Sequence, residues 1–186
     1  RGGAVSSLGA DLRIDGVTIT GSRGSQGGGG LMVEGGALTL VDSVITGNTA
    51  GGAFGTVVLG GGVFAHDAAV SVSGTTFDAN SAGYTYEGVI IATGVGGGLG
   101  VAEASGTVTI DSSTFAGNVV RGAGAGGGLG LFPGVATTIT GSTFSGNIAE
   151  SFGGAGSGYG GGIAQRLDGS LTISHSTVAE NTGGGV

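Results

Sequence analysis

The stretch that decides the fold covers residues 126–147 and reads GGGLGLFPGVATTITGSTFSGN. It consists of a glycine block, a short apolar segment, a Pro-Gly turn, an alternating apolar and polar segment, and a closing Ser-Thr-Phe-x-x-Asn. The rest of the chain repeats this order with variations. Internal repetition of this kind is typical of architectures in which each repeat stacks on the one before it. The repeat therefore predicts the fold class before any single residue is interpreted.

Columns of equivalent residues define the repeat. One column holds every asparagine of the chain: Asn48, Asn80, Asn118, Asn147 and Asn181. Three residues earlier stands a bulky apolar residue: Ile45, Phe77, Phe115, Phe144 and Val178. Five residues before each asparagine stands a hydroxyl: Ser43, Thr75, Ser113, Ser142 and Ser176. We expect the amides to hydrogen-bond from coil to coil at a left-handed corner, and the bulky residues to stack inside as an apolar file.

The repeats begin at the residue that follows each glycine block. These residues are Val5, Leu31, Val63, Leu99, Leu129, Ile163 and Val186, which are 26, 32, 36, 30, 34 and 23 residues apart. Each repeat has room for three short strands: one after the glycines, one in the alternating segment, and one through Phe-x-x-Asn. The pattern predicts an all-β parallel β-solenoid of six coils, without helix, that forms a single domain over residues 1–186.

Composition and charge exclude several classes of protein. The 49 glycines follow no strict three-residue period and only one proline is present, which excludes collagen. A hydrophobic content of 39% argues against a disordered chain. The net charge is −7 and the five cations are all arginine, so no basic stripe is available for nucleic acid. Glycine interrupts the apolar runs, so no membrane-spanning segment is expected. Without cysteine, no disulfide or thiolate metal site forms.

The paired motifs resemble the repeats of the chlamydial polymorphic outer-membrane proteins and, more widely, the right-handed parallel β-helix of autotransporter passengers and surface adhesins. The family's GGA(I/L/V) motif stands at residues 2–5, 61–63, 97–99, 127–129 and 161–163, usually with glycine in place of alanine. Its FxxN motif stands at residues 77–80, 115–118 and 144–147. The resemblance covers the whole chain. It implies a right-handed coil and an exported protein, with no active-site residue or cofactor to carry over.

The expected function is a non-catalytic, extracellular structural or adhesive solenoid on a bacterial cell surface. Neither end of the repeat series carries a polar cap, although isolated solenoids normally have one. We therefore expect a segment of a longer repetitive chain, or a subunit that stacks end to end with another copy. A host or surface glycan or protein is the other expected partner.

A binding loop is predicted where the repeat varies most, between each asparagine and the next glycine block. Its candidate residues are Tyr84, Tyr86, Glu87 and Tyr159. Insertions in solenoids map to one face, and aromatic rings supply contact area with a polar tip. The alternative is a loop that only packs its rings on the flank of the rod.

Carboxylates at the first turn form a second column and are the candidate calcium ligands: Glu34, Asp67 and Glu103 in consecutive coils, then Asp168. Hard cations prefer such oxygen ligands. The aspartate-bearing nonapeptide of calcium-loaded β-rolls is absent, which favours solvated turn residues.

Two other functions remain open. Polysaccharide lyases and glycoside hydrolases also use β-helices, but the strand-borne Asp15 and Asp111 stand three coils apart, ~14 Å. An ice-binding protein would use outward hydroxyls of the alternating segment, found at residues 71–73, 138–140 and 172–174. Val41 and Asp111 interrupt that grid.

Overall fold

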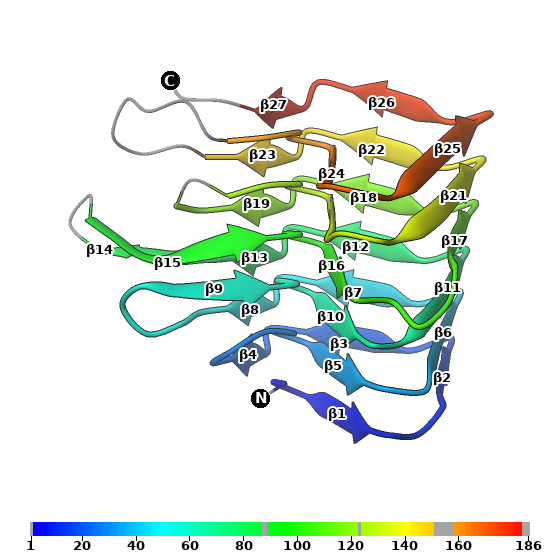
Figure 1. Ribbon diagram of the computed structural model, residues 1–186, viewed down its shortest axis with the longest axis horizontal. Helices are drawn as coiled ribbons and strands as arrows, with labels where there is room; N and C mark the ends of the chain where they lie inside the picture. The colour runs from blue at the N-terminus through cyan, green and yellow to red at the C-terminus, as the bar shows by residue number, and fades with distance from the viewer. Residues whose placement is uncertain (1, 87–88, 123, 151–157, 184–186) are drawn as a thin grey trace.

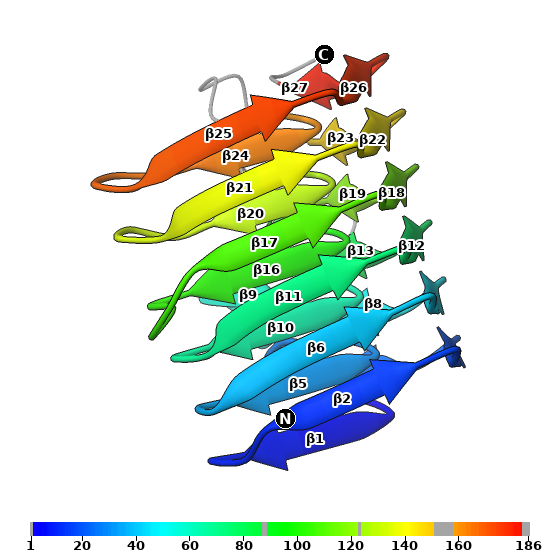
Figure 2. The ribbon, with the colours of Figure 1, turned by 90° about the vertical axis from the view of Figure 1, so that its right-hand side faces the viewer.

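The chain winds into six stacked coils (Figure 1). The computed structural model describes residues 2–86, 89–122, 124–150 and 158–183. Within these residues all regular elements are β-strands, and none is a helix. The coils advance as a right-handed helix, as two perpendicular views show (Figures 1 and 2). The predicted right-handed parallel β-solenoid of six coils is therefore confirmed.

Four six-stranded parallel sheets run along the axis of the rod, and each coil adds one strand to each. The first sheet contains β1 (Val5–Leu8), β5 (Leu31–Glu34), β10 (Val63–His66), β16 (Leu99–Ala102), β20 (Leu129–Leu131) and β24 (Ile163–Gln165). The second sheet contains β2 (Leu12–Asp15), β6 (Ala37–Val41), β11 (Ala69–Ser73), β17 (Val108–Asp111), β21 (Ala136–Thr140) and β25 (Ser170–Ser174).

The third predicted strand of each coil is in fact two strands. The third sheet contains β3 (Thr18–Thr20), β7 (Val44–Thr46), β12 (Thr76–Asp78), β18 (Thr114–Ala116), β22 (Thr143–Ser145) and β26 (Thr177–Ala179). The fourth sheet contains β4 (Arg23–Gly24), β8 (Thr49–Ala50), β13 (Ser81–Ala82), β19 (Val119–Val120), β23 (Ile148–Ala149) and β27 (Thr182–Gly183). The asparagine corner lies between them, so the prediction of three strands per coil was wrong by one.

Three further strands form a side sheet outside the coils. They are β9 (Thr56–Leu59), β14 (Tyr84–Tyr86) and β15 (Val89–Val95). β15 lies in the middle, parallel to β9 and antiparallel to β14. These residues were predicted to lie in loops, because the sequence shows no partner strand for them.

The register between coils follows the sequence columns. The residues that begin the repeats pair in order, from Val5 with Leu31 to Leu129 with Ile163. The alternating segments place two inward files in the second sheet, one of which ends in Ile110, Ile139 and Ile173. Because a slip of one residue would turn every inward side chain outward, the apolar files fix this register.

The bulky apolar column forms the predicted file inside the molecule. Phe77, Phe115 and Phe144 are completely buried, and their rings stack with centroids 4.4 and 4.5 Å apart and planes within 8° of parallel. Burying one such side chain stabilises the fold by ~1.5–3 kcal/mol. Parallel stacking follows from the coil spacing, which brings each ring directly over the last.

The asparagines form the predicted ladder. In the middle of the series, the Asn118 Oδ1 accepts from the backbone N–H and the Nδ2 of Asn80, both at 3.0 Å. The Asn118 Nδ2 donates to the Phe77 carbonyl at 2.9 Å and to the Asn147 Oδ1 at 2.9 Å. All four hydrogen-bonding positions of the amide are used, which is what a fully buried amide requires.

The left-handed conformation at the corner was predicted for the asparagine, and this prediction was wrong. The residue before the asparagine adopts it instead. The φ angles of these preceding residues are 64° at Gly21, 62° at Gly47, 51° at Ala79, 57° at Gly117, 61° at Gly146 and 56° at Glu180. The asparagine keeps an ordinary φ because its side chain must point inward to reach the next amide. Glycine occupies most of the preceding positions since it adopts this conformation without strain.

The hydroxyl column forms a second ladder, whose role the sequence did not reveal. The hydroxyl oxygen of each coil accepts from a backbone N–H of the previous coil: Ser43 from Val17 at 3.2 Å, Thr75 from Ser43 at 3.4 Å, Ser113 from Thr75 at 3.2 Å, Ser142 from Ser113 at 3.1 Å and Ser176 from Ser142 at 3.1 Å. Each hydroxyl also donates to a carbonyl two residues earlier, as Ser113 does to Asp111 at 2.7 Å. The ladder satisfies the backbone at the corner between the second and third sheets.

The glycine blocks lie directly against the asparagine ladder. A Cβ atom on Gly98 would stand 2.8 Å from the Gly128 carbonyl oxygen, 3.1 Å from Cδ1 of Phe115 and 3.2 Å from Cγ of Asn118. Gly62 and Gly128 have equivalent surroundings one coil away on either side. The preceding column packs against the backbone of the fourth sheet, where a Cβ on Gly97 would meet the amide nitrogen of Val119 at 2.8 Å. Two backbone layers therefore touch here, and only glycine fits between them.

This contact generates a stability prediction for Gly98→Ala. The added methyl group meets backbone rather than a flexible side chain, so we expect a loss of ~1–3 kcal/mol of unfolding free energy. Gly51→Ala is the matched control, because a Cβ at Gly51 has no atom within 4 Å and we expect a change within ~0.5 kcal/mol. Urea unfolding followed by circular dichroism measures both. Equal midpoints for the two variants would show that the glycine column is not a packing requirement.

Candidate binding surfaces

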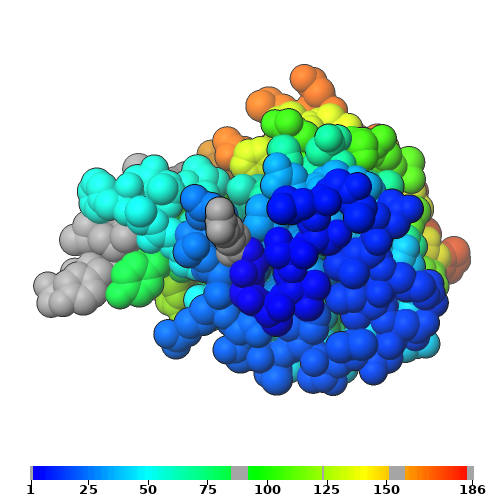
Figure 3. Space-filling model, turned by 90° about the horizontal axis from the view of Figure 1, so that it is seen from below, coloured from blue at the N-terminus to red at the C-terminus, as the bar shows by residue number. Residues whose placement is uncertain are grey.

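The side sheet projects from one flank of the rod (Figures 1 and 3). Its origin is the unequal length of the coils. Leu31 follows Val5 by 26 residues, whereas Val63 follows Leu31 by 32 and Leu99 follows Val63 by 36. The extra residues lie between the fourth-sheet strand and the next glycine block, where β9, β14 and β15 form. Segments of this kind can vary without disturbing the stacked core.

Of the four residues of the predicted binding loop, Tyr84 and Tyr159 have described side chains, and these two lie in different coils. Tyr84 begins β14 and is 47% exposed. Tyr86 ends β14, but its side chain and the whole of Glu87 lie outside the described residues. Tyr159 is 58% exposed and pairs with Ala125, which in turn pairs with Val95, so it lies two coils beyond the side sheet. Binding by the rings of Tyr84 and Tyr159 stays a prediction, as does the alternative that they pack on the flank.

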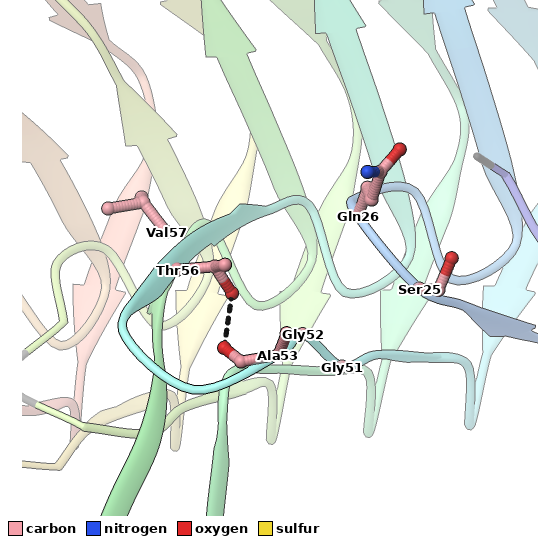
Figure 4. Close-up of a pocket in the computed structure, with 7 residues that line it drawn as sticks. All are labelled: Ser25, Gln26, Gly51, Gly52, Ala53, Thr56 and Val57. Carbon is pink, nitrogen blue, oxygen red and sulfur yellow. Dashed lines mark hydrogen bonds between the residues drawn. The ribbon is translucent and has the colours of Figure 1, made fainter.

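A hollow of about 590 Å³ lies under the side sheet (Figure 4). It is lined by Ser25, Gln26, Gly51, Gly52, Ala53, Thr56 and Val57. The Thr56 hydroxyl donates to the Ala53 carbonyl at 2.7 Å, which fixes the loop that leads into β9. This hollow could not be predicted from the sequence, because its residues are small or neutral and come from two coils. The one available signal was the difference in length between the first two coils.

One edge of β9 faces this hollow. Backbone groups of a strand point alternately to its two sides. The Leu59 carbonyl points away from β15 and accepts from the Gly28 N–H at 3.0 Å. Val57 is two residues earlier, so its N–H and C=O point the same way. Among the described residues, none pairs with these two groups on that side of β9.

The candidate calcium ligands do not share one column. Glu34 pairs in register with His66, whereas Asp67 is the next residue and stands in the column of Gly35 and Glu103. Asp67 and Glu103 have φ angles of 49° and 50°, so both occupy a left-handed turn position that aspartate in particular tolerates. The alignment of Glu34 with the other two was therefore wrong by one residue.

One of these carboxylates lies beside a histidine of the neighbouring coil. The Glu103 Oε2 lies 3.5 Å from Nε2 of His66. Within the described ranges, no group of three or more acidic, histidine or cysteine side chains is arranged to hold a metal ion. Asp168 follows Leu167 in the last coil, and both have left-handed φ angles, 41° and 46°.

The carboxylates considered for catalysis stand far apart. Asp15 pairs with Val41, Val41 with Ser73, and Ser73 with Asp111, so three coil spacings separate the two acids, ~14 Å. Paired carboxylates of glycosidases lie ~5–9.5 Å apart. Asp15 also accepts from Arg13 at 2.6 Å on the exposed surface. These two acids therefore do not form a glycosidase pair.

Outward hydroxyls form two rows along the rod. On the second sheet the row consists of Thr39, Ser71, Thr109, Thr138 and Thr172, with Arg13 in the first coil. On the third sheet it consists of Thr18, Thr76, Thr114, Thr143 and Thr177, with Val44 in the second coil. The predicted hydroxyl grid was confined to the second sheet. The row on the third sheet was not predicted, because the sequence pattern predicts the third and fourth strands of each coil as one strand.

Comparison with known proteins finds no significant match for this chain, whether among models of protein families, among curated proteins or among solved structures. The described residues contain no helix long and apolar enough to cross a membrane.

Proposed function

We propose that the chain is a non-catalytic, extracellular structural and adhesive β-solenoid, and that it forms part of a bacterial surface fibre. The observation that carries this proposal is the continuity of the two ladders. The asparagine ladder joins all five asparagines and begins at the Ser22 N–H, which donates to Asn48 at 2.9 Å. The hydroxyl ladder joins the same six coils.

A rod held in this way suits a load-bearing spacer. Backbone hydrogen bonds of four sheets and side-chain hydrogen bonds of two ladders all run along the axis, so each coil is tied to the next at every side. Six coils at the spacing of paired strands give a length of ~29 Å. The buried amides of Asn80, Asn118 and Asn147 form their hydrogen bonds with neighbouring coils.

The adhesive part of the proposal rests on the side sheet. Phe54, Val57 and Tyr84 are 76%, 53% and 47% exposed on or beside it. Exposed aromatic and apolar groups mark interaction surfaces, and tyrosine offers both area and a polar tip. We propose a surface glycan or a protein as the partner of the side sheet.

Labelling of intact cells tests the proposed location. We expect antibodies raised against the folded protein to label the surface of unpermeabilised cells of the source organism, and brief external proteolysis to remove the label. An antibody against a cytoplasmic protein of the same cells is the control for intact membranes. Label that appears only after permeabilisation would contradict an extracellular role.

We also propose that the last coil pairs with a further coil, supplied by a second copy or by the same polypeptide. Leu171, Ile173 and Val178 of this coil are 37%, 42% and 52% exposed, whereas their equivalents one coil earlier are buried. The Asn147 Nδ2 donates both to the Phe115 carbonyl and to the Asn181 Oδ1. Among the described residues, the Asn181 Nδ2 donates only to the Phe144 carbonyl, which leaves a hydrogen for another amide.

Sedimentation velocity at increasing protein concentration tests the version with a second copy. We expect concentration-dependent end-to-end association, and we expect Val178→Glu to reduce it by placing a charge in the contact. Val44→Glu, an exposed substitution on the outer face of the third sheet in the second coil, is the control for added charge away from both ends. A wild-type protein that stays monomeric at high concentration would exclude stacking of copies.

Ice binding is a second candidate function, favoured by the two hydroxyl rows. Their members repeat every ~4.8 Å along the axis, which gives a regular array of donors and acceptors. We expect, on this hypothesis, measurable thermal hysteresis that is lost in Thr109→Lys and kept in Ser6→Lys, an exposed substitution on the first sheet. Absence of thermal hysteresis in the wild-type protein would remove this candidate.

A further inference from the structure

We propose that the free edge of β9 binds an extended, uncharged segment of a partner polypeptide as an added β-strand. This site goes beyond the structural role above and does not depend on it. The argument rests on the backbone of Val57, on the hollow beside it, and on the side chains that line the hollow.

The backbone of Val57 offers one donor and one acceptor to the hollow. Both point away from β15, and within the described part of the chain neither has a partner on that side. A strand edge with unpaired groups is a template for another strand. The adjacent position along the same edge is already filled, because Gly27 pairs with Leu59 as an isolated parallel bridge. A guest strand would therefore pair at Val57 and extend away from this bridge, toward Thr56.

The hollow has room for a guest strand because the first coil is short. Its chain passes from Gly24 to Gly27 through Ser25 and Gln26 alone, and so leaves about 590 Å³ under β9. Gly51 borders this space, and a Cβ there would meet no atom within 4 Å. Figure 4 shows the loop residues on one side of the space and Ser25 and Gln26 on the other.

The charge and size of the residues that line the hollow indicate which residue types the guest segment should have. The seven lining residues carry no charge, so a charged side chain would lose water without gaining a counterion. The inner face of the side sheet is tightly filled, since a Cβ on Gly52 would meet Val58 Cγ2 at 2.6 Å. Val57, on the outer face, is 53% exposed. The guest should therefore place small residues inward and a β-branched residue beside Val57.

The opposite edge of β9 already holds a strand of this type. Ala92, Thr93 and Gly94 of β15 pair with Thr56, Val57 and Val58, which places alanine and glycine on the inner face and threonine beside Val57. A second copy of the chain is the less favoured guest, because its own segment of this type, in β15, is already paired on both edges by β9 and β14. We therefore commit to a separate polypeptide with an alternating small and β-branched segment.

A peptide that copies residues 91–95, joined to a fluorophore through a flexible neutral linker, is the probe. Fluorescence anisotropy is measured with the whole protein and with two variants, Val57→Pro and Val57→Thr. Proline removes the N–H, whereas threonine keeps the backbone and the β-branched shape. We expect Val57→Pro to weaken binding by at least about tenfold and Val57→Thr to change it by less than about threefold. The same peptide with an N-methyl group on its threonine is the control for strand pairing, and we expect it to bind weakly.

A second measurement guards against misfolding of the proline variant. We expect hydrogen exchange at the Val57 amide of the wild-type protein to slow in the presence of the peptide, while exchange at the asparagine ladder stays unchanged. No binding of the peptide, equal binding to the wild-type protein and to folded Val57→Pro, or unchanged exchange at Val57 would each overturn the proposal. Self-association of the wild-type protein that Val57→Pro abolishes would also overturn it, since the guest would then be a second copy.

Discussion

The contact between the glycine columns and the asparagine ladder is the constraint on which the structure depends. At Gly62, Gly98 and Gly128 the chain passes so close to the amides that a single methyl group would overlap the next coil. This closeness lets each Asn side chain reach both neighbours along the axis, and it excludes water from the corner. The ladder and the glycine columns therefore depend on each other, because the amides reach their neighbours only where glycine allows this close approach.

Because this contact holds the coils from inside, the outside of the rod is free to vary. Coil length changes by ten residues between the first coil, of 26, and the third, of 36, without any shift in the register of the four long sheets. All of the added chain is absorbed at one place, between the fourth sheet and the glycine block. The side sheet and its hollow arise there, so the position of the candidate binding surface is a consequence of how the core is closed.

One buried position of the core is polar although the rest of its column is apolar. Thr137 occupies a position that is apolar in the neighbouring coils, pairing with Val108 and Leu171, and it is buried. Its Oγ1 lacks a hydrogen-bond partner among the described residues. An unsatisfied buried hydroxyl costs ~1–3 kcal/mol. The stacked phenylalanines and the two ladders offset this loss of stability, because several independent sets of interactions hold neighbouring coils together.

The sequence by itself determined the coil count, the inward files and the asparagine ladder, because identical residues at equivalent positions can only be explained by stacking. It did not determine the division of the third strand, the left-handed residue before each asparagine, or the column of Asp67 and Glu103, since these depend on backbone angles that several residue types adopt. The side sheet and the free edge at Val57 were decided by tertiary structure alone. They require strands from different coils to meet, and no periodic pattern within one coil records which neighbour is long and which is short.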